Sequence, residues 1–348
     1  MKIKIFFLTV VAVCLLHGCN GKVEKGTTGV IPIKLDLKKE MRSIHDIDLI
    51  KDVEVINLDC DEVLIGEIDK VIKFDSIIYL MDKKQNRSIY LFNLNGDFIQ
   101  VISKYGNGPE EYMQLTDMFI NAEDSTLNIV SRIDNKLFKY DLRGENLVAI
   151  EKIPKSFTSL IKIDKGYVGY MNNWSQDPKE PYNVWSMNNK MELTGHYFEI
   201  DKAWGSRGID SDVFSNYRNN YYCIMPMDYN IYSITTEDLE VKYSFDLGSF
   251  QWPNVSESEI QDNDKRRELV NKYVHRFYNF QETENHLIVQ FLYKNQYLLG
   301  TYNKIKEETN IVELSAYTGK YFFSFGNIIS FDEKTIYTTI EASNMKRI

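Results

Sequence analysis

The sequence predicts an all-β fold: a β-propeller of six blades, each made of four antiparallel strands. The first observation is an internal repeat, in which residues 69–99 align with residues 117–147 at a constant offset of 48 and without a gap. The second is the content of each unit, where four short apolar stretches alternate with polar turns. Four strands in ~45 residues is the size of one propeller blade, and a repeat of this period is typical of propellers and solenoids. The third is the near absence of long apolar stretches at helical spacing, which argues against helical repeats.

Residues 1–18 have the pattern of an export signal. Lys2 and Lys4 precede an apolar stretch of about a dozen residues, which is too short to cross a bilayer. The stretch ends in Leu16-His17-Gly18-Cys19, and a cysteine in this place is the residue that lipoprotein processing modifies. We therefore predict lipid attachment at Cys19 and a location in the cell envelope, on the periplasmic or surface side of the outer membrane. An ordinary secretory signal followed by a chance cysteine is the alternative.

Residues 19–45 are predicted to be a flexible tether, and residues 46–348 are predicted to be the propeller. Glycine, lysine and threonine crowd the first part of the tether without apolar periodicity. Such a segment would connect an anchored cysteine to a folded body.

The strands of the first blade follow directly from the repeat unit. The predicted strands are Lys70–Phe74, Ile77–Asp82, Ser88–Asn93 and Phe98–Ser103. Asn95-Gly96 is predicted to be a tight hairpin turn, because both residues tolerate positive φ.

Later units keep the spacing but share fewer identical residues with the first two. Their predicted strands include Val184–Met187, Ile231–Ile234, His286–Phe291, Tyr297–Tyr302, Ile328–Phe331 and Thr335–Ile340. The last two of these belong to a sixth unit that is short of strands, so we expect an incomplete last blade. Propellers commonly close with an N-terminal strand, which we expect at Val53–Leu58.

One helix is expected between the fourth and fifth blades, at about residues 256–279. Ser256 and Glu259 form a capping-box pattern, and apolar residues between Leu269 and Phe277 fall on one helical face. Insertions on one face of a repeat fold often form the binding surface. The helix either contributes to such a surface or simply covers apolar residues.

The composition limits the classes of partner. The formal net charge is −9, and an acidic surface repels phosphate backbones, so nucleic acid is not an expected partner. Beyond the signal and Cys19, the cysteines are Cys60 and Cys223. One disulfide is possible in an oxidising compartment, but the two cysteines cannot form a stabilising framework.

No motif predicts a catalytic residue or a metal ligand, and the sequence leaves any cofactor open. The histidines are scattered, without the spacing of a zinc site. The acidic clusters lack the order of a calcium-binding loop, and no Gly-x-Ser-x-Gly elbow is present.

Aromatic residues in predicted loops are the best candidates for a binding site. Trp174 and Trp204 have Asn, Ser and Gly neighbours, and Arg207 follows closely. Exposed aromatic rings beside polar groups stack on sugars or anchor protein partners. Packing between blades is the alternative role for such rings.

The segment Gly106-Asn107-Gly108-Pro109-Glu110-Glu111-Tyr112 and the hairpin Tyr90–Phe98 resemble the six-bladed β-propeller lipoproteins. These are relatives of the NHL-type propellers and are abundant in some gut-dwelling Gram-negative bacteria. Gly106 and Gly108 permit positive φ, and Tyr112 is expected to pack between adjacent blades. The resemblance implies a propeller over most of residues 46–348, but no particular ligand.

The expected function is a ligand-binding or protein-binding module of the cell envelope. A glycan, a peptide or an envelope protein would be its ligand, and the lipid anchor would hold it at the membrane. The alternative is a metal-dependent propeller enzyme of the lyase or lactonase type, with its site at the central channel.

Overall fold

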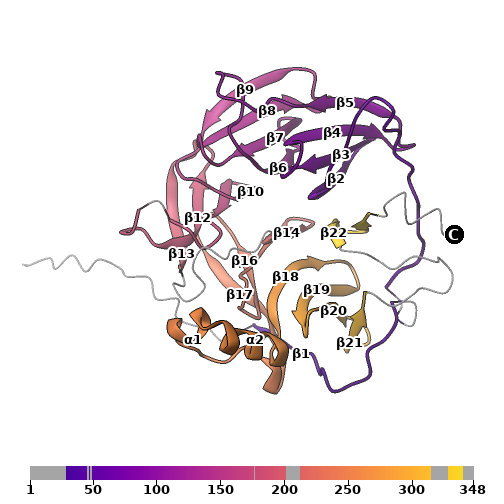
Figure 1. Ribbon diagram of the computed structural model, residues 1–348, viewed down its shortest axis with the longest axis vertical. Coiled ribbons are helices and arrows are strands. Elements are labelled where there is room, and N and C mark those ends of the chain that lie inside the picture. The colour runs from indigo at the N-terminus through magenta and orange to yellow at the C-terminus, as the bar shows by residue number, and fades with distance from the viewer. Residues whose placement is uncertain are drawn as a thin grey trace, which may run out of the picture.

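Five complete blades form around a central axis in the computed structural model, which describes residues 29–44, 47, 49–175, 177–200, 212–314 and 328–339 (Figure 1). The strands of blade 1 are β2 (Lys70–Phe74), β3 (Ile77–Asp82), β4 (Ser88–Asn93) and β5 (Phe98–Ile102). Those of blade 2 are β6 (Leu115–Asn121), β7 (Thr126–Ser131), β8 (Lys136–Asp141) and β9 (Leu147–Lys152). Those of blade 3 are β10 (Ser159–Ile163), β11 (Gly166–Tyr170), β12 (Tyr182–Asn188) and β13 (Leu193–Glu199).

The two remaining complete blades differ in their number of strands. Blade 4 consists of β14 (Phe214–Tyr217), β15 (Asn220–Ile224), β16 (Asn230–Ile234) and β17 (Leu239–Asp246), with β1 (Ile31–Lys34) added at its outer edge. Blade 5 consists of β18 (His275–Glu282), β19 (His286–Tyr293), β20 (Gln296–Asn303) and β21 (Glu308–Glu313). Around the axis, the first strands of blades 1 and 2, of blades 2 and 3, and of blades 4 and 5 contact one another.

Local sequence explains why the repeat unit folds as a blade. The middle strands β3 and β7 are buried along almost their whole length, since both faces of a blade pack against neighbours. Gly96, at φ 92°, makes the turn between β4 and β5, where a side chain would be strained. The strand bounds predicted for blade 1 agree with β2 to β5 to within one residue.

Tyr112 packs between blades 1 and 2, as expected. Its ring is fully buried and meets the ring of Phe138 edge-on, with centroids 6.0 Å apart. The glycines before it act differently from the prediction, because neither Gly106 nor Gly108 has positive φ. A Cβ at Gly106 would lie 2.0 Å from Oε2 of Glu111, so a larger residue there would require the Glu111 side chain to move.

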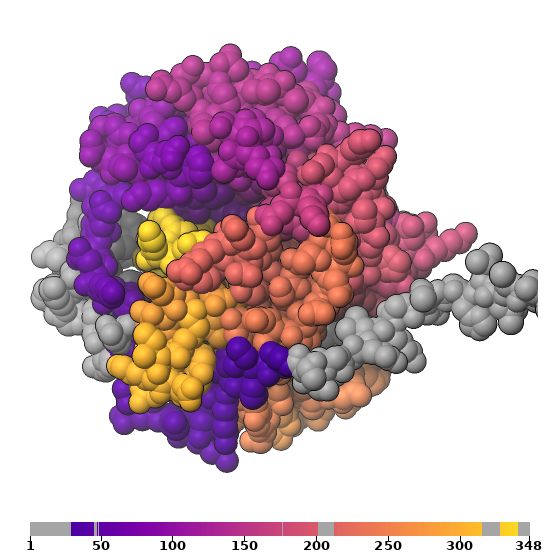
Figure 2. Space-filling view, turned by 180° about the vertical axis from the view of Figure 1, so that it is seen from behind, coloured from indigo at the N-terminus to yellow at the C-terminus, as the bar shows by residue number. Residues whose placement is uncertain are grey.

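The expected six four-stranded blades are corrected to five. The sixth position holds a two-stranded sheet, β22 (Ile328–Phe331) and β23 (Ile336–Thr338), among the described residues. Ile328 packs against the apolar cluster of blade 5, and Ile329 packs against that of blade 1. In Figure 2 the yellow atoms of this sheet lie between the two blades.

The N-terminal segments also differ from expectation. β1 lies within the segment 19–45 that was expected to be a flexible tether, and it pairs in parallel with β17. Val53–Leu58 forms no strand; Val53 packs beside blade 5, while Ile56 and Leu58 pack against blade 1. Blade 4, rather than the last blade, receives the N-terminal strand.

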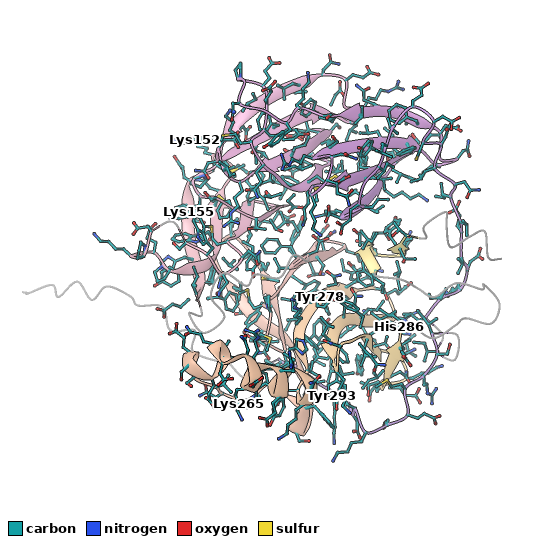
Figure 3. All side chains as sticks on the ribbon, viewed as in Figure 1. Lys152, Lys155, Lys265, Tyr278, His286 and Tyr293 are labelled. Carbon is teal, nitrogen blue, oxygen red and sulfur yellow. The ribbon has the colours of Figure 1, made fainter. Side chains whose placement is uncertain are left out.

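The insertion before blade 5 contains two short helices instead of one longer helix. After a 3-10 turn, η1 (Gly248–Phe250), come α1 (Glu257–Gln261) and α2 (Asn263–Lys272). The predicted capping box is present, because Ser256 and Glu259 satisfy each other's backbone N–H groups. Asp262 caps α2, and the chain has already entered β18 at His275, so the helix ends earlier than predicted. α2 contacts β19 at the end of blade 5, near the labelled Lys265 and Tyr293 in Figure 3.

Candidate functional site

The central channel is a cavity of about 410 Å³ that is lined mainly by the first strands of the blades and by β22. Lys70 lies at its wall, with Nζ 2.7 Å from Oδ1 of Asp117 and 3.2 Å from Oδ1 of Asp212. Burial alone would lower the pKa of Lys70, but the two carboxylates outweigh burial and raise it. Burial also raises the pKa of Asp117, against the opposing effect of Lys70. Lys70 is thus paired with both Asp117 and Asp212, and we interpret this network of charges as structural.

A second and larger cavity lies on one face of the propeller. This face carries α1, α2 and the loops between the second and third strands of the blades, and we call it the helix-side face. The cavity, here called the helix-side cavity, measures about 880 Å³. Its lining residues are Tyr170, Asn173, Asn183, Phe198, Glu199, Met225, Pro226, Met227, Asp228, Arg266, Val270, His275, Arg276, Leu292, Asn295 and Tyr297. Blades 3, 4 and 5 and α2 all contribute, and the volume is in the range of small-molecule sites.

The backbone around the helix-side cavity contains unusual conformations. Phe198, Met227 and Arg276 have φ of 56°, 69° and 52°, in the left-handed region that such side chains rarely adopt. Each of these conformations costs on the order of 1 kcal/mol or more and persists only where the surrounding fold imposes it. Arg276 follows the first residue of β18, where the register of the pairing with β19 shifts. Met227 lies in the loop between β15 and β16.

Two arginines bring positive charge to the helix-side cavity. Arg266 extends from α2, and its Nη2 donates a hydrogen bond to Oδ1 of Asn263 at 2.8 Å. Its Nη1 is buried and has no hydrogen-bond partner among the described residues. Arg276 is exposed at the cavity wall, and no described carboxylate forms an ion pair with either guanidinium.

Asp228 and His275 also line the helix-side cavity, and each interacts with groups of the protein itself. Asp228 accepts hydrogen bonds on both oxygens, from the Tyr232 hydroxyl and from Asn230. His275 is buried, with Nδ1 3.4 Å from the carbonyl oxygen of Tyr273. Burial lowers the pKa of His275, so the ring is held neutral at physiological pH. Among the described residues that line this cavity, the side-chain atom that is buried without a hydrogen-bond partner is Nη1 of Arg266, a positively charged donor.

Of the predicted binding residues, Trp174 is the one that the structure describes. It lies in the loop between β11 and β12, 38% exposed, with the Arg132 guanidinium 4.7 Å from its ring centroid. Its neighbour Asn173 lines the helix-side cavity, but Trp174 itself does not. Trp204 and Arg207, and the predicted lipid-attachment residue Cys19, lie outside the described residues.

Aromatic rings elsewhere in the same blade have structural roles. Trp185 packs beneath Lys155, labelled in Figure 3, whose Nζ lies 4.1 Å from the ring centroid. Its indole N–H donates to the carbonyl oxygen of Tyr182. The packing alternative for aromatics therefore applies to Trp185.

Sequence reasoning missed Arg266, Arg276 and His275. The sequence feature that came closest to indicating them was the helix expected at about residues 256–279. That helix was expected either to form a binding surface or to cover apolar residues. The helix covers apolar residues through the buried Leu269, and its residues Arg266 and Val270 line the cavity.

The described residues also show the state of the cysteines, the metal-ligating side chains and the helices. Cys60 is exposed and Cys223 is buried in blade 4, and both are free thiols. No three His, Cys, Asp or Glu side chains in the described ranges lie in an arrangement that would hold a metal ion. None of the described helices has the length and apolar character needed to span a membrane.

Comparison with known proteins supports the fold and identifies the family. A crystal structure of a Bacteroides fragilis protein, for which export has been suggested, is similar with a TM-score of 0.66 and 16% identity, covering 86% of each chain. A member of the DUF4221 family from Bacteroides vulgatus gives a TM-score of 0.49 and 9% identity, covering 73% of this chain and 83% of that one. No curated protein matches the sequence significantly. The family model described as "Domain of unknown function (DUF4934)" matches residues 28–348, and the chain therefore belongs to that family.

Proposed function

We propose that this protein is an exported, lipid-anchored binding module of the cell envelope, and that its ligand occupies the helix-side cavity. The observation that carries the proposal is the cavity itself: about 880 Å³, with walls from three blades and an inserted helix. Large cavities with mixed apolar and polar walls are the usual ligand sites of proteins. The central channel is a weaker candidate, since it is smaller and Lys70 is already paired with Asp117 and Asp212.

The proposed location rests on the signal pattern of residues 1–18 and on the structural similarity to a protein for which export has been suggested. β1 lies at the outer edge of blade 4, so the segment that leads from Cys19 joins the propeller at its rim. An anchor attached there would leave the helix-side cavity open to ligands. Labelling of growing cells with a radioactive fatty acid tests the anchor. Label on the wild-type chain and its loss in Cys19→Ser would support the proposal, whereas equal labelling of both would oppose it.

Ligand binding is tested on the chain that begins at residue 20, by calorimetric titration with panels of glycans and peptides. Val270→Trp would fill the cavity from α2, while Val148→Trp places the same group on β9, where Val148 is 60% exposed. We expect saturable binding that Val270→Trp abolishes and Val148→Trp preserves. Binding that survives Val270→Trp, or turnover of a ligand instead of simple binding, would overturn the proposal.

A further inference from the structure

We propose that the helix-side cavity takes a ligand with a carboxylate at one end of an apolar body, and that Arg266 binds the carboxylate. This inference rests on the proposed binding function and names the chemistry of its ligand. The carboxylate would occupy the position in front of Nη1 of Arg266.

The first step of the argument is the unsatisfied nitrogen of Arg266. Nη2 is held by Asn263, which fixes the guanidinium plane, while Nη1 is buried without a partner among the described residues. A buried donor of a charged group that lacks a hydrogen bond is costly, and an incoming anion removes that cost. A guanidinium with one edge held and another free is suited to a planar acceptor such as a carboxylate.

The second step is the charge around the cavity. The chain carries a formal net charge of −9, yet Arg266 and Arg276 both line this cavity. Asp228 lies in the same cavity, but its two oxygens accept hydrogen bonds from Tyr232 and Asn230. Glu199 is exposed at the wall and, among the described residues, forms no ion pair with either arginine. The cavity therefore offers cationic donors that no carboxylate among the described residues satisfies.

The third step is the apolar character of the remaining wall. Met225, Leu292 and Val270 line the cavity with Phe198 and Tyr297. The amides of Asn173 and Asn183 are turned toward each other, because the Asn183 side chain donates to that of Asn173 at 3.2 Å. Methionine, aliphatic and aromatic side chains together favour an apolar ligand body over a polar one. Fatty acids and peptides with an apolar free C-terminus share this chemistry.

The test compares acids with their uncharged analogues, on the chain that begins at residue 20, by calorimetric titration at low salt. The probes are decanoate against decanol, and acetyl-trileucine with a free C-terminus against its C-terminal amide. We expect one or both acids to bind roughly 10-fold to 100-fold more tightly than the matched neutral probe, as for a hydrogen bond to a charged group. The pair that shows this difference identifies the source of the carboxylate.

The variant that isolates the inference is Arg266→Met, which keeps an unbranched apolar stem and removes the guanidinium and its charge. Lys265→Met is the control, because Lys265 is on the same helix but pairs with Glu268 at the surface. Arg266→Met should lower the affinity for the acid by about 10-fold or more and leave that for the neutral probe unchanged, whereas Lys265→Met should change neither. Thermal unfolding of both variants shows that they are folded.

The outcomes separate this inference from the proposed function. If acid and neutral probes bind equally well, and Val270→Trp blocks both, the cavity is a binding site but the carboxylate assignment is wrong. If the acid binds but Arg266→Met has no effect, the role of Arg266 is overturned. If no probe binds to the wild-type chain, the apolar carboxylate class is overturned, while the wider ligand panels still test the binding function.

Discussion

Nζ of Lys70 lies 2.7 Å from Oδ1 of Asp117 and so connects the first strand of blade 1 with the first strand of blade 2. Asp117 also accepts hydrogen bonds from the backbone N–H groups of Met118 and Leu160, the latter at the start of blade 3. One buried carboxylate thereby links three consecutive blades at the channel wall.

Replacing Asp117 by Asn is expected to lower the free energy of unfolding by about 3 kcal/mol, because it leaves the buried Lys70 ammonium with a single counter-charge. The matched change is Asp212→Asn, since the Asp212 side chain is 32% exposed and that of Asp117 only 4%. An exposed pair contributes about 1 kcal/mol or less, so Asp212→Asn should have the smaller effect. Urea unfolding measures both variants. Equal losses would show that Asp117 has no special role.

β1 is expected to stabilise blade 4. Ile33 is 1% exposed and packs in the apolar cluster shared by blades 4 and 5, whereas Ile31 on the same strand is 40% exposed. Ile33→Ala should therefore cost about 3 kcal/mol, the range for a buried aliphatic side chain. Ile31→Ala should stay within about 0.5 kcal/mol. Thermal and urea unfolding of the two variants measure the difference, and similar small effects would mean that β1 is dispensable.

The two-stranded sheet at the sixth position is expected to hold blades 5 and 1 together. Ile328 is 5% exposed and packs with Ile288 and Leu299 of blade 5. Ile328→Ala should lower the free energy of unfolding by about 3 kcal/mol. Ile305→Ala serves as the control, because Ile305 is 73% exposed. Hydrogen exchange should show faster exchange in β2 and β18, which both contact β22, in the Ile328 variant alone. Unchanged exchange there would contradict a closing role.

Stability is expected to decrease as the pH falls below about 6.5, the ordinary pKa of histidine. Burial lowers the pKa of His275 in the folded state, so the unfolded chain takes up a proton at a pH where the folded protein does not. The unfolded state then binds more protons, and stability rises with pH across the window between the two pKa values. His275→Gln should flatten this part of the curve of melting temperature against pH between pH 7 and pH 5. A slope that the substitution leaves unchanged would assign the dependence to other groups.

The strands and turns of the blade unit were predictable because residues close together in the sequence determine them. The strand bounds of blade 1 and the turn at Gly96 follow from apolar alternation and from a residue that tolerates positive φ. The capping box at Ser256 was predictable for the same reason. The number of complete blades was not, because it depends on whether the last strands find partners across the ring.

The candidate site was hardly predictable. Arg266 in α2 and Phe198 in β13 are far apart in sequence and line one cavity only because the folded chain brings α2 and blade 3 to the same cavity. The expected residue Trp174 lies beside that cavity without lining it. No motif marks such residues, since each of them is ordinary in its own segment.

The sequence alone determined the size, the strand pattern and the turns of the repeating unit, because neighbouring residues decide these through alternation and backbone preference. The tertiary structure decided the rest. β1 joins a strand more than two hundred residues away, the sixth position holds two strands, and two arginines meet in one cavity. These outcomes depend on contacts between distant segments, which form only when the blades pack around the axis and bury their apolar faces.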